Sequence, residues 1–346
     1  MKKTMKAAML YGPRDLRLEE VPIPEPKEHE VLLQILANGL CGSDIHFYEE
    51  GKLGPFVVDS PYIPGHEAVG RVVVSNTVGP KHPKGELVVL EPGIPCGHCE
   101  FCRSGRYNLC PDVVFLSAPP INGTFCEYVA IAADMVYTLP STLSVEQGAL
   151  AEPLSVGMQA CRRAGLKAGQ SVAVVGSGPI GLITALVARA CGASPIIMLD
   201  IFDTRLQKAK ELVADAVINS AKEDSVQAVT TYTNGRGVDV VFDTSGSSKA
   251  NASTPFLSCR GGVITIVGWP EKASFEFPME QVLEKELDIR GVNRYCNTYG
   301  PVLSLLASGL LQVDGLISHR FAFDQVCEAF AFATDNRQSV IKVVIA

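Results

Sequence analysis

The sequence predicts an α/β protein with an irregular β domain followed by a domain built on a doubly wound parallel sheet. The chain has 346 residues. This length exceeds the size at which a single hydrophobic core usually stops growing, so two domains are expected. Up to residue 152, short apolar runs lie between prolines and glycines, which is typical of strands joined by turns. After residue 152, β-branched runs alternate with helical stretches, which favours a parallel sheet with helices on both faces.

The individual elements follow in chain order. The strands expected in the first domain are Val31–Ala37, Val69–Ser75 and Leu87–Leu90. The strands expected in the second are Ser171–Val175, Ile196–Leu199, Val238–Phe242 and Val263–Val267, with helices at Ile180–Ala190 and Arg205–Val213. A final helix near Val302–Ser308 and a strand at Val340–Ile345 complete the chain. Pattern alone does not assign this tail to either domain.

Composition excludes several classes of function. A net charge of −7 disfavours nucleic acid or an anionic membrane as the main partner. No stretch approaches the roughly 20 apolar residues of a membrane span. Met1–Leu10 carries lysines but no apolar run long enough for a signal peptide. We therefore expect a cytoplasmic protein with no membrane partner.

A glycine-rich segment predicts a dinucleotide site. Gly176, Gly178 and Gly181 form G-x-G-x-x-G, with Ile180 inside it, directly after a predicted strand and at the start of a helix. Gly176 permits the tight turn, and Gly178 lets the backbone approach the pyrophosphate. Gly181 lets the helix pack on the sheet. The helix N-terminus offers free N–H groups to the phosphates.

Asp200 ends the next strand, where an acid hydrogen-bonds the ribose hydroxyls. A carboxylate there also repels a 2′-phosphate and so favours NAD over NADP. Arg205 leaves the alternative open, because a nearby arginine can accept that phosphate. The alternative interpretation is that Asp200 is a strand-terminal aspartate that caps the following helix.

Eleven cysteines without an export signal do not suggest a disulfide framework. Four of them form a C-x₂-C-x₂-C-x₇-C cluster, which suits a closed, structural zinc site. An iron–sulfur cluster is the competing interpretation, which the longer final spacing disfavours. A third interpretation is that these are free thiols that cluster by chance. The cluster consists of Cys96, Cys99, Cys102 and Cys110.

A second set of candidate metal ligands is spread along the first domain. Cys41, His66 and a glutamate, either Glu67 or Glu152, would supply sulfur, nitrogen and oxygen donors. A catalytic zinc needs about three such ligands and one exchangeable position. Each residue taken alone could equally be a buried cysteine, a core histidine or a surface acid.

Taken together, these motifs resemble those of the zinc-containing medium-chain dehydrogenases over essentially the whole chain. The matching segments are 39–44, 65–67, the four-cysteine cluster, 152–157 and 176–181. Within that family the sequence most resembles the sorbitol, xylitol and arabinitol dehydrogenase branch, through segments 91–96, 105–108 and 294–298.

The resemblance implies a GroES-like catalytic domain formed by residues 1–152 and 288–346, and a Rossmann domain formed by residues 153–287. It implies NAD and two zinc ions, with Cys41, His66 and Glu67 on the catalytic zinc. Glu152 would be an alternative ligand or would act through the metal-bound water. A homo-oligomer, most often a tetramer, is also implied.

The implied reaction converts a secondary hydroxyl of a small polyol to a ketone. Ser43 would take the hydroxyl proton and His46 would pass it towards solvent. The residues expected to contact substrate are Phe47, Phe115, Glu152, Arg294 and Tyr295. Those expected to border the nicotinamide half of the cofactor are Val267, Gly268, Val292 and Asn293.

Two departures from the family pattern affect these expectations. Polyol dehydrogenases often have tyrosine after the relay histidine, but this chain has Phe47, which leaves room for a less polar diol. The segment 84–88 reverses a surface charge without touching a proposed ligand. The alternatives are a butanediol- or threonine-type dehydrogenase, a non-catalytic nucleotide-binding protein of the same fold, and a zinc-ribbon nucleic-acid binder. The last rests on the four-cysteine cluster alone and conflicts with the net charge.

Overall fold

The computed structural model describes residues 3–77 and 81–346 and divides into two compact units. The first unit comprises Met1–Glu152, Tyr299–Ala307 and Leu316–Ala346. The second comprises Pro153–Thr298 and Ser308–Gly315. Residues 1–2 of the N-terminal segment discussed above lie outside the described residues.

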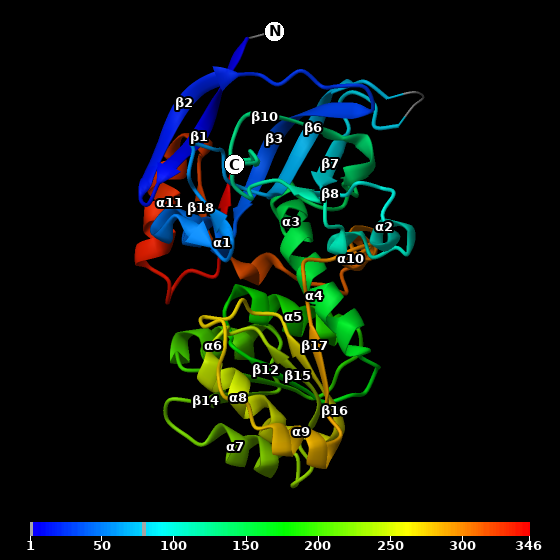
Figure 1. Cartoon of the computed structure of the whole chain (residues 1–346), viewed down its shortest axis with the longest axis vertical. Coiled ribbons are helices and arrows are strands. Elements are labelled where there is room, and N and C mark those ends of the chain that lie inside the picture. The colour runs from blue at the N-terminus through cyan, green and yellow to red at the C-terminus, as the bar shows by residue number, and fades with distance from the viewer. Residues whose placement is uncertain (1–2, 78–80) are drawn as a thin grey trace. The chain divides into compact units, whose positions relative to one another are not determined.

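A seven-stranded sheet forms most of the first unit (Figure 1). Its order is β11-β7-β6-β3-β19-β18, and β10 also pairs with β3. The strands are β3 (Glu30–Leu40), β6 (Glu67–Ser75), β7 (Leu87–Leu90), β10 (Tyr128–Ala132), β11 (Val136–Thr138), β18 (Ile317–Phe321) and β19 (Lys342–Ile345). Three two-stranded sheets accompany this sheet: β1 (Thr4–Gly12) with β2 (Asp15–Pro22), β4 (Lys52–Leu53) with β5 (Phe56–Val57), and β8 (Gly93–Ile94) with β9 (Val114–Phe115).

Aromatic side chains fill the core of the first unit. The Phe125 and Phe330 rings meet edge to face with centroids 5.2 Å apart, and Tyr48 packs on Phe330 at 5.5 Å. These contacts join α1 to α11, so the tail of the chain is part of this core. The helices of this unit are α1 (Gly42–Glu50), α2 (Glu100–Arg103), α3 (Val145–Ala149), α10 (Tyr299–Ala307) and α11 (Val326–Asp335).

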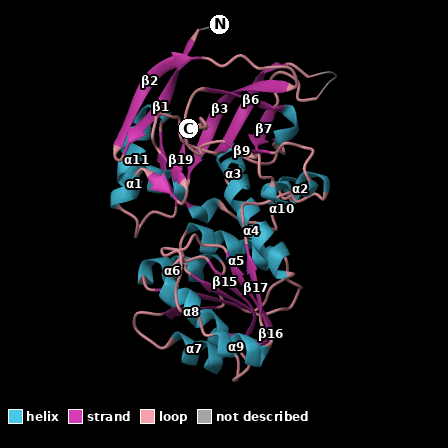
Figure 2. Cartoon of the chain, in the orientation of Figure 1, coloured by secondary structure: helices cyan, strands magenta, loops and turns pink. Residues whose placement is uncertain are grey.

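The second unit contains a six-stranded sheet in the order β14-β13-β12-β15-β16-β17, with every neighbouring pair parallel. Helices flank the sheet (Figure 2), so the predicted doubly wound fold is confirmed, and its strand order is that of a Rossmann domain. The strands are β12 (Val172–Val175), β13 (Ile196–Asp200), β14 (Ala216–Asn219), β15 (Val238–Asp243), β16 (Ser258–Ile266) and β17 (Asp288–Gly291). The helices are α5 (Pro179–Ala190), α6 (Asp203–Leu212), α7 (Ser225–Tyr232), α8 (Ser248–Leu257) and α9 (Met279–Lys285).

The chain re-enters the first unit at Tyr299, later than the expected residue 288. The reason is β17, which pairs in parallel with β16 and keeps residues 288–298 with the second sheet. A further helix, α4 (Ala151–Ala164), begins just before Glu152 and continues into the second unit.

The C-terminal strand β19 pairs antiparallel with β3. This pairing assigns the tail, which sequence pattern alone left open, to the first unit. No helix in the described parts of the chain is both long and apolar enough to cross a membrane.

Candidate active site and metal centres

A group of possible metal ligands forms where β3 ends and β6 begins. These strands are antiparallel neighbours. Cys41 follows β3 as the N-cap residue of α1, and His66 directly precedes Glu67, the first residue of β6. One ligand atom of each of these three residues lies within 4.8 Å of the other two. Sulfur, nitrogen and oxygen donors at this spacing fit zinc.

Gly39 makes room for the carboxylate of this group. It is paired with Glu67 in the sheet register. A Cβ at position 39 would lie 2.0 Å from Glu67 Oε2. Any larger residue at position 39 would therefore displace the carboxylate.

Asp44 is a buried carboxylate behind the candidate ligands. It accepts hydrogen bonds from Cys41 N at 3.2 Å, Gly65 N at 3.1 Å and Ser117 Oγ at 2.8 Å. Its Oδ1 lies 3.6 Å from His66 Nδ1, a buried nitrogen with no hydrogen-bond partner among the described residues. Burial by itself raises the pKa of Asp44, but His66 and the Ser117 hydrogen bond outweigh it and lower the pKa overall. Asp44 is thus placed to orient the histidine, as outer-shell carboxylates do at zinc sites.

Lys342 on β19 reaches the same group from the other side of β3. Its Nζ lies 2.8 Å from both carboxylate oxygens of Glu67 and donates to Leu40 O at 3.2 Å. Both charged side chains are buried. Burial by itself lowers the pKa of Lys342, but the charge of Glu67 outweighs it, so the pKa is raised and the ammonium persists.

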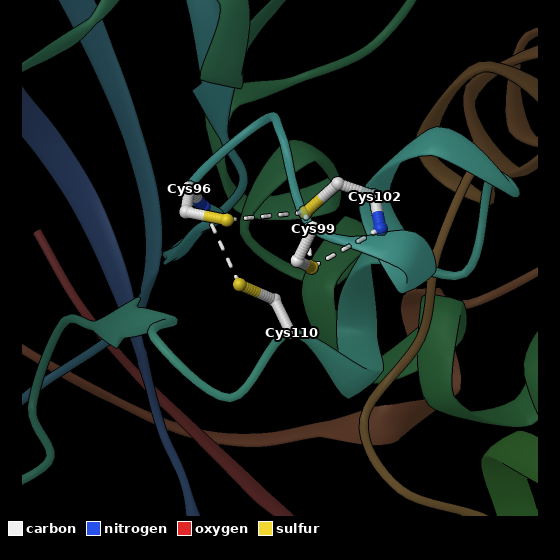
Figure 3. Close-up of side chains that lie close together, drawn as sticks. All are labelled: Cys96, Cys99, Cys102 and Cys110. Carbon is white, nitrogen blue, oxygen red and sulfur yellow. Dashed lines mark hydrogen bonds between the residues drawn. The ribbon is translucent and has the colours of Figure 1, made fainter.

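The four cysteines of the predicted structural site converge in one lobe (Figure 3). Their sulfurs lie within 4.8 Å of one another. Cys96 N donates to Cys110 Sγ at 3.4 Å, and Cys102 N donates to Cys99 Sγ at 3.5 Å. Four converging sulfurs, two of which accept backbone N–H bonds, fit a closed tetrahedral zinc site. His98 is exposed, and its Nδ1 lies 2.8 Å from Cys96 O, so it is not one of the group.

A buried acid fixes this lobe to the sheet. The hydroxyls of Tyr107 in the lobe and Tyr137 in β11 each donate to Glu91 at 2.8 Å. Burial raises the pKa of Glu91, and the two hydrogen bonds oppose the shift. Tyr137 in turn stacks on Tyr299 with ring centroids 5.0 Å apart.

The glycine loop lies between β12 and α5, as predicted. Gly176 has φ 96°, in the left-handed region that favours glycine. A Cβ on Gly181 would lie 1.9 Å from Gly176 O, so that position also requires glycine. α5 begins at Pro179, next to Ile180, with Gly178 as its N-cap. The first-turn N–H groups of α5 are therefore available to an anion, as a pyrophosphate site requires.

Asp200, at the end of β13, holds the glycine loop and the next turn together. Its Oδ2 accepts from Ser177 N at 2.7 Å, and its Oδ1 accepts from Ile201 N at 2.8 Å and Phe202 N at 3.0 Å. Arg205 Nη1 lies 3.9 Å from Asp200 Oδ2, and its guanidinium lies over the Phe202 ring. The acid and the arginine that were predicted from sequence therefore lie beside the glycine loop.

Further predicted cofactor residues follow the carboxyl ends of neighbouring strands. Val267 and Gly268 follow β16, and Gly268 leaves no room for a side chain, since its Cβ would lie 2.6 Å from Gly246 N. Val292 and Asn293 follow β17. In a parallel sheet these positions share the edge at which Gly176 follows β12, where dinucleotides bind.

Comparisons with known proteins agree with this geometry. The family model described as "Alcohol dehydrogenase GroES-like domain" matches residues 27–141, and "Zinc-binding dehydrogenase" matches residues 179–308. Sorbitol dehydrogenase of Bacillus subtilis is 38% identical over 343 residues, or 99% of this chain and 97% of that protein. Sorbitol dehydrogenase of Rattus norvegicus is 43% identical over 332 residues, or 94% and 91%. The chain belongs to the zinc-containing medium-chain dehydrogenases.

Within this family it lies in the polyol dehydrogenase branch, and it is an oxidoreductase that uses zinc and NAD. The resemblance inferred from its motifs is confirmed. A solved structure, 2R,3R-butanediol dehydrogenase from Bacillus subtilis, matches with a TM-score of 0.90 at 32% identity and covers 99% of both chains.

The motifs of this dehydrogenase did not decide which of two glutamates, Glu67 or Glu152, is the zinc ligand. The structure distinguishes them. Glu67 belongs to the compact ligand group with Cys41 and His66, and Glu152 does not. Glu152 is buried in the first turn of α4, and its charge helps to raise the pKa of Lys342. It therefore lies in the neighbourhood of the group without joining it.

The proposed relay residues share one face of α1. Ser43 is half-buried, and His46 follows it by three residues, which places the two on the same side of a helix. His46 is exposed, with its Nδ1 3.6 Å from Glu50 Oε1. The order from half-buried hydroxyl to exposed imidazole suits proton transfer outward.

The aromatic residues expected at the substrate differ in their surroundings. Phe115 lies beside the candidate ligands, with its ring centroid 5.7 Å from that of His66. Phe47 is buried and packs edge to face on Tyr62 with centroids 6.2 Å apart. Phe47 therefore contributes to the core of the first unit.

The segment after β17 has an unusual backbone. Arg294 and Asn297 have φ of 54° and 55°, values that non-glycine residues rarely adopt. Arg162 Nη1 donates to Asn297 O at 2.9 Å and so braces the turn. Tyr295 is buried, and burial lowers the pKa of Arg294. Strained turns of this kind are common at ligand sites.

Two residues of this site were not singled out from sequence, namely Asp44 and Lys342. Asp44 had a signal, because it stands in the Cys41–Asp44 motif at the position where an acid completes a helix cap. The signal for Lys342 was weaker, a single lysine within the apolar run 340–345.

Proposed function

We propose that this enzyme oxidises a secondary hydroxyl of a small polyol to the ketose with NAD and zinc, and catalyses the reverse reduction. The observation that carries the proposal is the group of Cys41, His66 and Glu67, with its mixed donors within 4.8 Å. Support for a polyol of the sorbitol, xylitol or arabinitol type comes from sorbitol dehydrogenases that match along nearly the whole chain.

Cys41, His66 and Glu67 would hold the catalytic zinc. When bound, zinc lowers the pKa of the substrate hydroxyl, and NAD accepts the hydride. Asp44 would keep His66 in its ligating orientation, and Lys342 would neutralise and position Glu67. Glu152 would be an alternative ligand, or would act through water. The four-cysteine lobe would hold a structural zinc.

Ser43 would accept the proton of the substrate hydroxyl, and His46 would release it to solvent. The positions of the two on one face of α1 support this direction. Phe115, Arg294 and Tyr295 would contact the substrate. Of these, Phe115 already lies against the His66 ring.

The glycine loop would bind the pyrophosphate, and Asp200 would bind the adenosine ribose. The carboxylate would disfavour a 2′-phosphate, so NAD is the expected cofactor. Arg205 lies 3.9 Å from that carboxylate and would partly offset the repulsion. Some activity with NADP is therefore expected.

A vicinal-diol substrate is the second candidate. Phe47 replaces the tyrosine common in polyol dehydrogenases, and its side chain is buried against Tyr62. A butanediol dehydrogenase is also among the matching structures. Initial rates with NAD and NADP on sorbitol, xylitol, arabinitol, galactitol and butanediol would decide. A kcat/KM for butanediol above that of every polyol would replace the polyol proposal.

The enzyme is also proposed to be a homo-oligomer, with a tetramer as the expected size. The edge strand β17 exposes Ile289, and the same unit exposes Leu283 and Trp269, the latter to 63%. Because Trp269 is the only tryptophan, its emission should shift to the red if dilution dissociates the assembly. Sedimentation would give the size, and a monomer at all concentrations would refute the proposal. The cytoplasmic location expected from sequence stays a prediction.

A further inference from the structure

Two thiols outside both zinc groups lie together in the second unit. Cys161 is near the C-terminal end of α4, and Cys191 is the C-cap residue of α5. The segments that follow the two helices are joined next to these residues, since Gly169 N donates to Gly192 O at 2.8 Å. Hydrogen bonding between the two side chains shifts the pKa of each thiol. The pair belongs to neither the catalytic group nor the four-cysteine lobe.

The packing of two helices holds this pair in place. A Cβ on Gly157 of α4 would lie 3.1 Å from Ile183 Cγ2 and 3.2 Å from Val187 Cγ2 of α5. Cys161 follows Gly157 by one helical turn, and Cys191 follows Val187 by one turn. Each cysteine therefore lies one helical turn beyond the close contact between α4 and α5. The Cys191 backbone is also fixed, since its N–H donates to Val187 O at 2.9 Å.

The two thiols have different reactivity. The hydrogen bond from Cys161 lowers the pKa of Cys191 to about 7; partial burial opposes this and the charge of Arg162 assists it. The same hydrogen bond, together with burial, raises the pKa of Cys161. Cys191 is half-buried and Cys161 is buried. Cys191 is therefore the more accessible and more readily ionised thiol, and thiolates are the attacking species in disulfide exchange.

We propose that Cys161 and Cys191 are a modification site that forms a reversible disulfide when the enzyme meets a low-molecular-weight disulfide, RSSR. The Cys191 thiolate attacks one sulfur of RSSR, releases RS⁻ and becomes a mixed disulfide. The Cys161 thiol then loses its proton, attacks the Cys191 sulfur and releases the second RS⁻. Two protein thiols are oxidised, and one RSSR is reduced to two RSH.

The bond would connect the two helices that lead to functional residues. α4 carries Glu152 in its first turn, and α5 begins at the glycine loop. The closed loop would contain all of β12 and Gly176–Gly181. The redox state of the thiol pair would therefore fix the packing of the cofactor-binding helix.

Peptide mapping of the zinc-loaded enzyme tests the proposal. After incubation with oxidised glutathione, the protein is digested without reductant by trypsin and a glutamate-specific protease. Fragments 147–162 and 190–205 each contain one cysteine. The expected product joins these two fragments, weighs two hydrogens less than their sum and separates in dithiothreitol. Glutathione retained on Cys191 without the cross-link, or no reaction at either thiol, would overturn the proposal.

Three variants assign the order of attack. Cys161→Ser should accumulate glutathione on Cys191, because no second thiol resolves the mixed disulfide. Cys191→Ser should leave Cys161 unmodified. Cys259→Ser is the matched control, since Cys259 is a buried thiol of the same unit that lies 3.9 Å from Asp239 Oδ1. It should form the cross-link at the wild-type rate, and equal modification of Cys161 and Cys191 in the single variants would refute the assigned roles.

Discussion

Lys342 holds both carboxylate oxygens of Glu67 at 2.8 Å in the interior of the first unit, although the two residues are 275 positions apart in the chain. The ion pair is buried on both sides. Such pairs cost desolvation energy when they form, but removing one partner leaves an unpaired buried charge. The site thus depends on a residue from β19, the last strand along the chain.

Lys342→Met should lower the free energy of unfolding by about 3–5 kcal/mol, because Glu67 would keep a buried charge without a partner. Urea unfolding after mild chelation would measure this without the countercharge of a metal. Adding Glu67→Gln to the variant should restore much of the loss. The matched control is Lys81→Met, which breaks an exposed pair with Asp134 and should cost less than about 1 kcal/mol. Equal losses in the two lysine variants would contradict this account.

Zinc content should divide into two classes. The open group of Cys41, His66 and Glu67 should lose its zinc to a mild chelator, together with activity, while the four-cysteine lobe keeps its own. Metal analysis before and after chelation, beside an activity assay, would show this. A single zinc equivalent in fully active protein would contradict the assignment of two sites.

Asp200→Ala should weaken NAD binding and narrow the preference for NAD over NADP. Loss of a hydrogen bond to a charged group costs about 1.5–3 kcal/mol, or roughly one to two decades in affinity. Arg205→Ala is the matched variant, because Arg205 lies 3.9 Å from the same carboxylate and should matter more for NADP. Binding titrations with both cofactors would test each variant. An unchanged NAD-to-NADP ratio in Asp200→Ala would exclude Asp200 as the selector.

Arg294→Ala should reduce kcat/KM far more for a polyol than for a simple secondary alcohol. A guanidinium can donate to several hydroxyls, and contacts remote from the reacting carbon appear in turnover as well as in binding. Four measurements suffice: wild type and variant, each with a polyol and a plain alcohol. Equal fractional losses for both substrates would mean that Arg294, with its left-handed backbone, supports the turn rather than the substrate.

Asp239 should make its full contribution to stability above about pH 4. Burial raises its pKa, but hydrogen bonds from Arg236 and Ser171 outweigh burial and lower the pKa from 3.8 to about 2. A lowered pKa in the folded state stabilises the protein above the unfolded-state value, and the gain is lost between about pH 4 and pH 2. Asp239→Asn should therefore cost about 1 kcal/mol at neutral pH and much less near pH 2. Unfolding curves of wild type and variant across this range would give the free energy of unfolding of each at every pH. The two values should converge as the pH falls, and a constant difference between them would contradict the prediction.

The glycine loop and the four-cysteine lobe could be predicted because their signals are local. Val172–Val175 is a continuous apolar strand followed at once by Gly176. The four cysteines lie within one short segment, so folding needs only to close a loop around a metal. The convergence of Cys41 and His66 rested instead on a combination of motifs and on resemblance, since their proximity depends on the pairing of β3 with β6.

The elements that sequence missed depend on tertiary contacts. β17 is short and carries Asp288 and Arg290, so nothing local marks it as a strand until it pairs with β16. α4 passes through Glu152 and Pro153, which suggested a junction, yet proline is compatible with the first turn of a helix. The signal for Lys342 was weak because its partner, Glu67, is far away in sequence.

The position of β19 between β3 and β18 sets an order of assembly during synthesis. Domains tend to fold as the ribosome releases them, the earliest first. Here the strands of the N-terminal unit emerge early, but β3 lacks its neighbour β19 until residues 342–345 have been made. The Rossmann sheet has all six of its strands once residue 291 is out, so we expect it to form first. Nascent chains arrested before β19 should resist protease in the second unit while Cys41 remains open to thiol labelling.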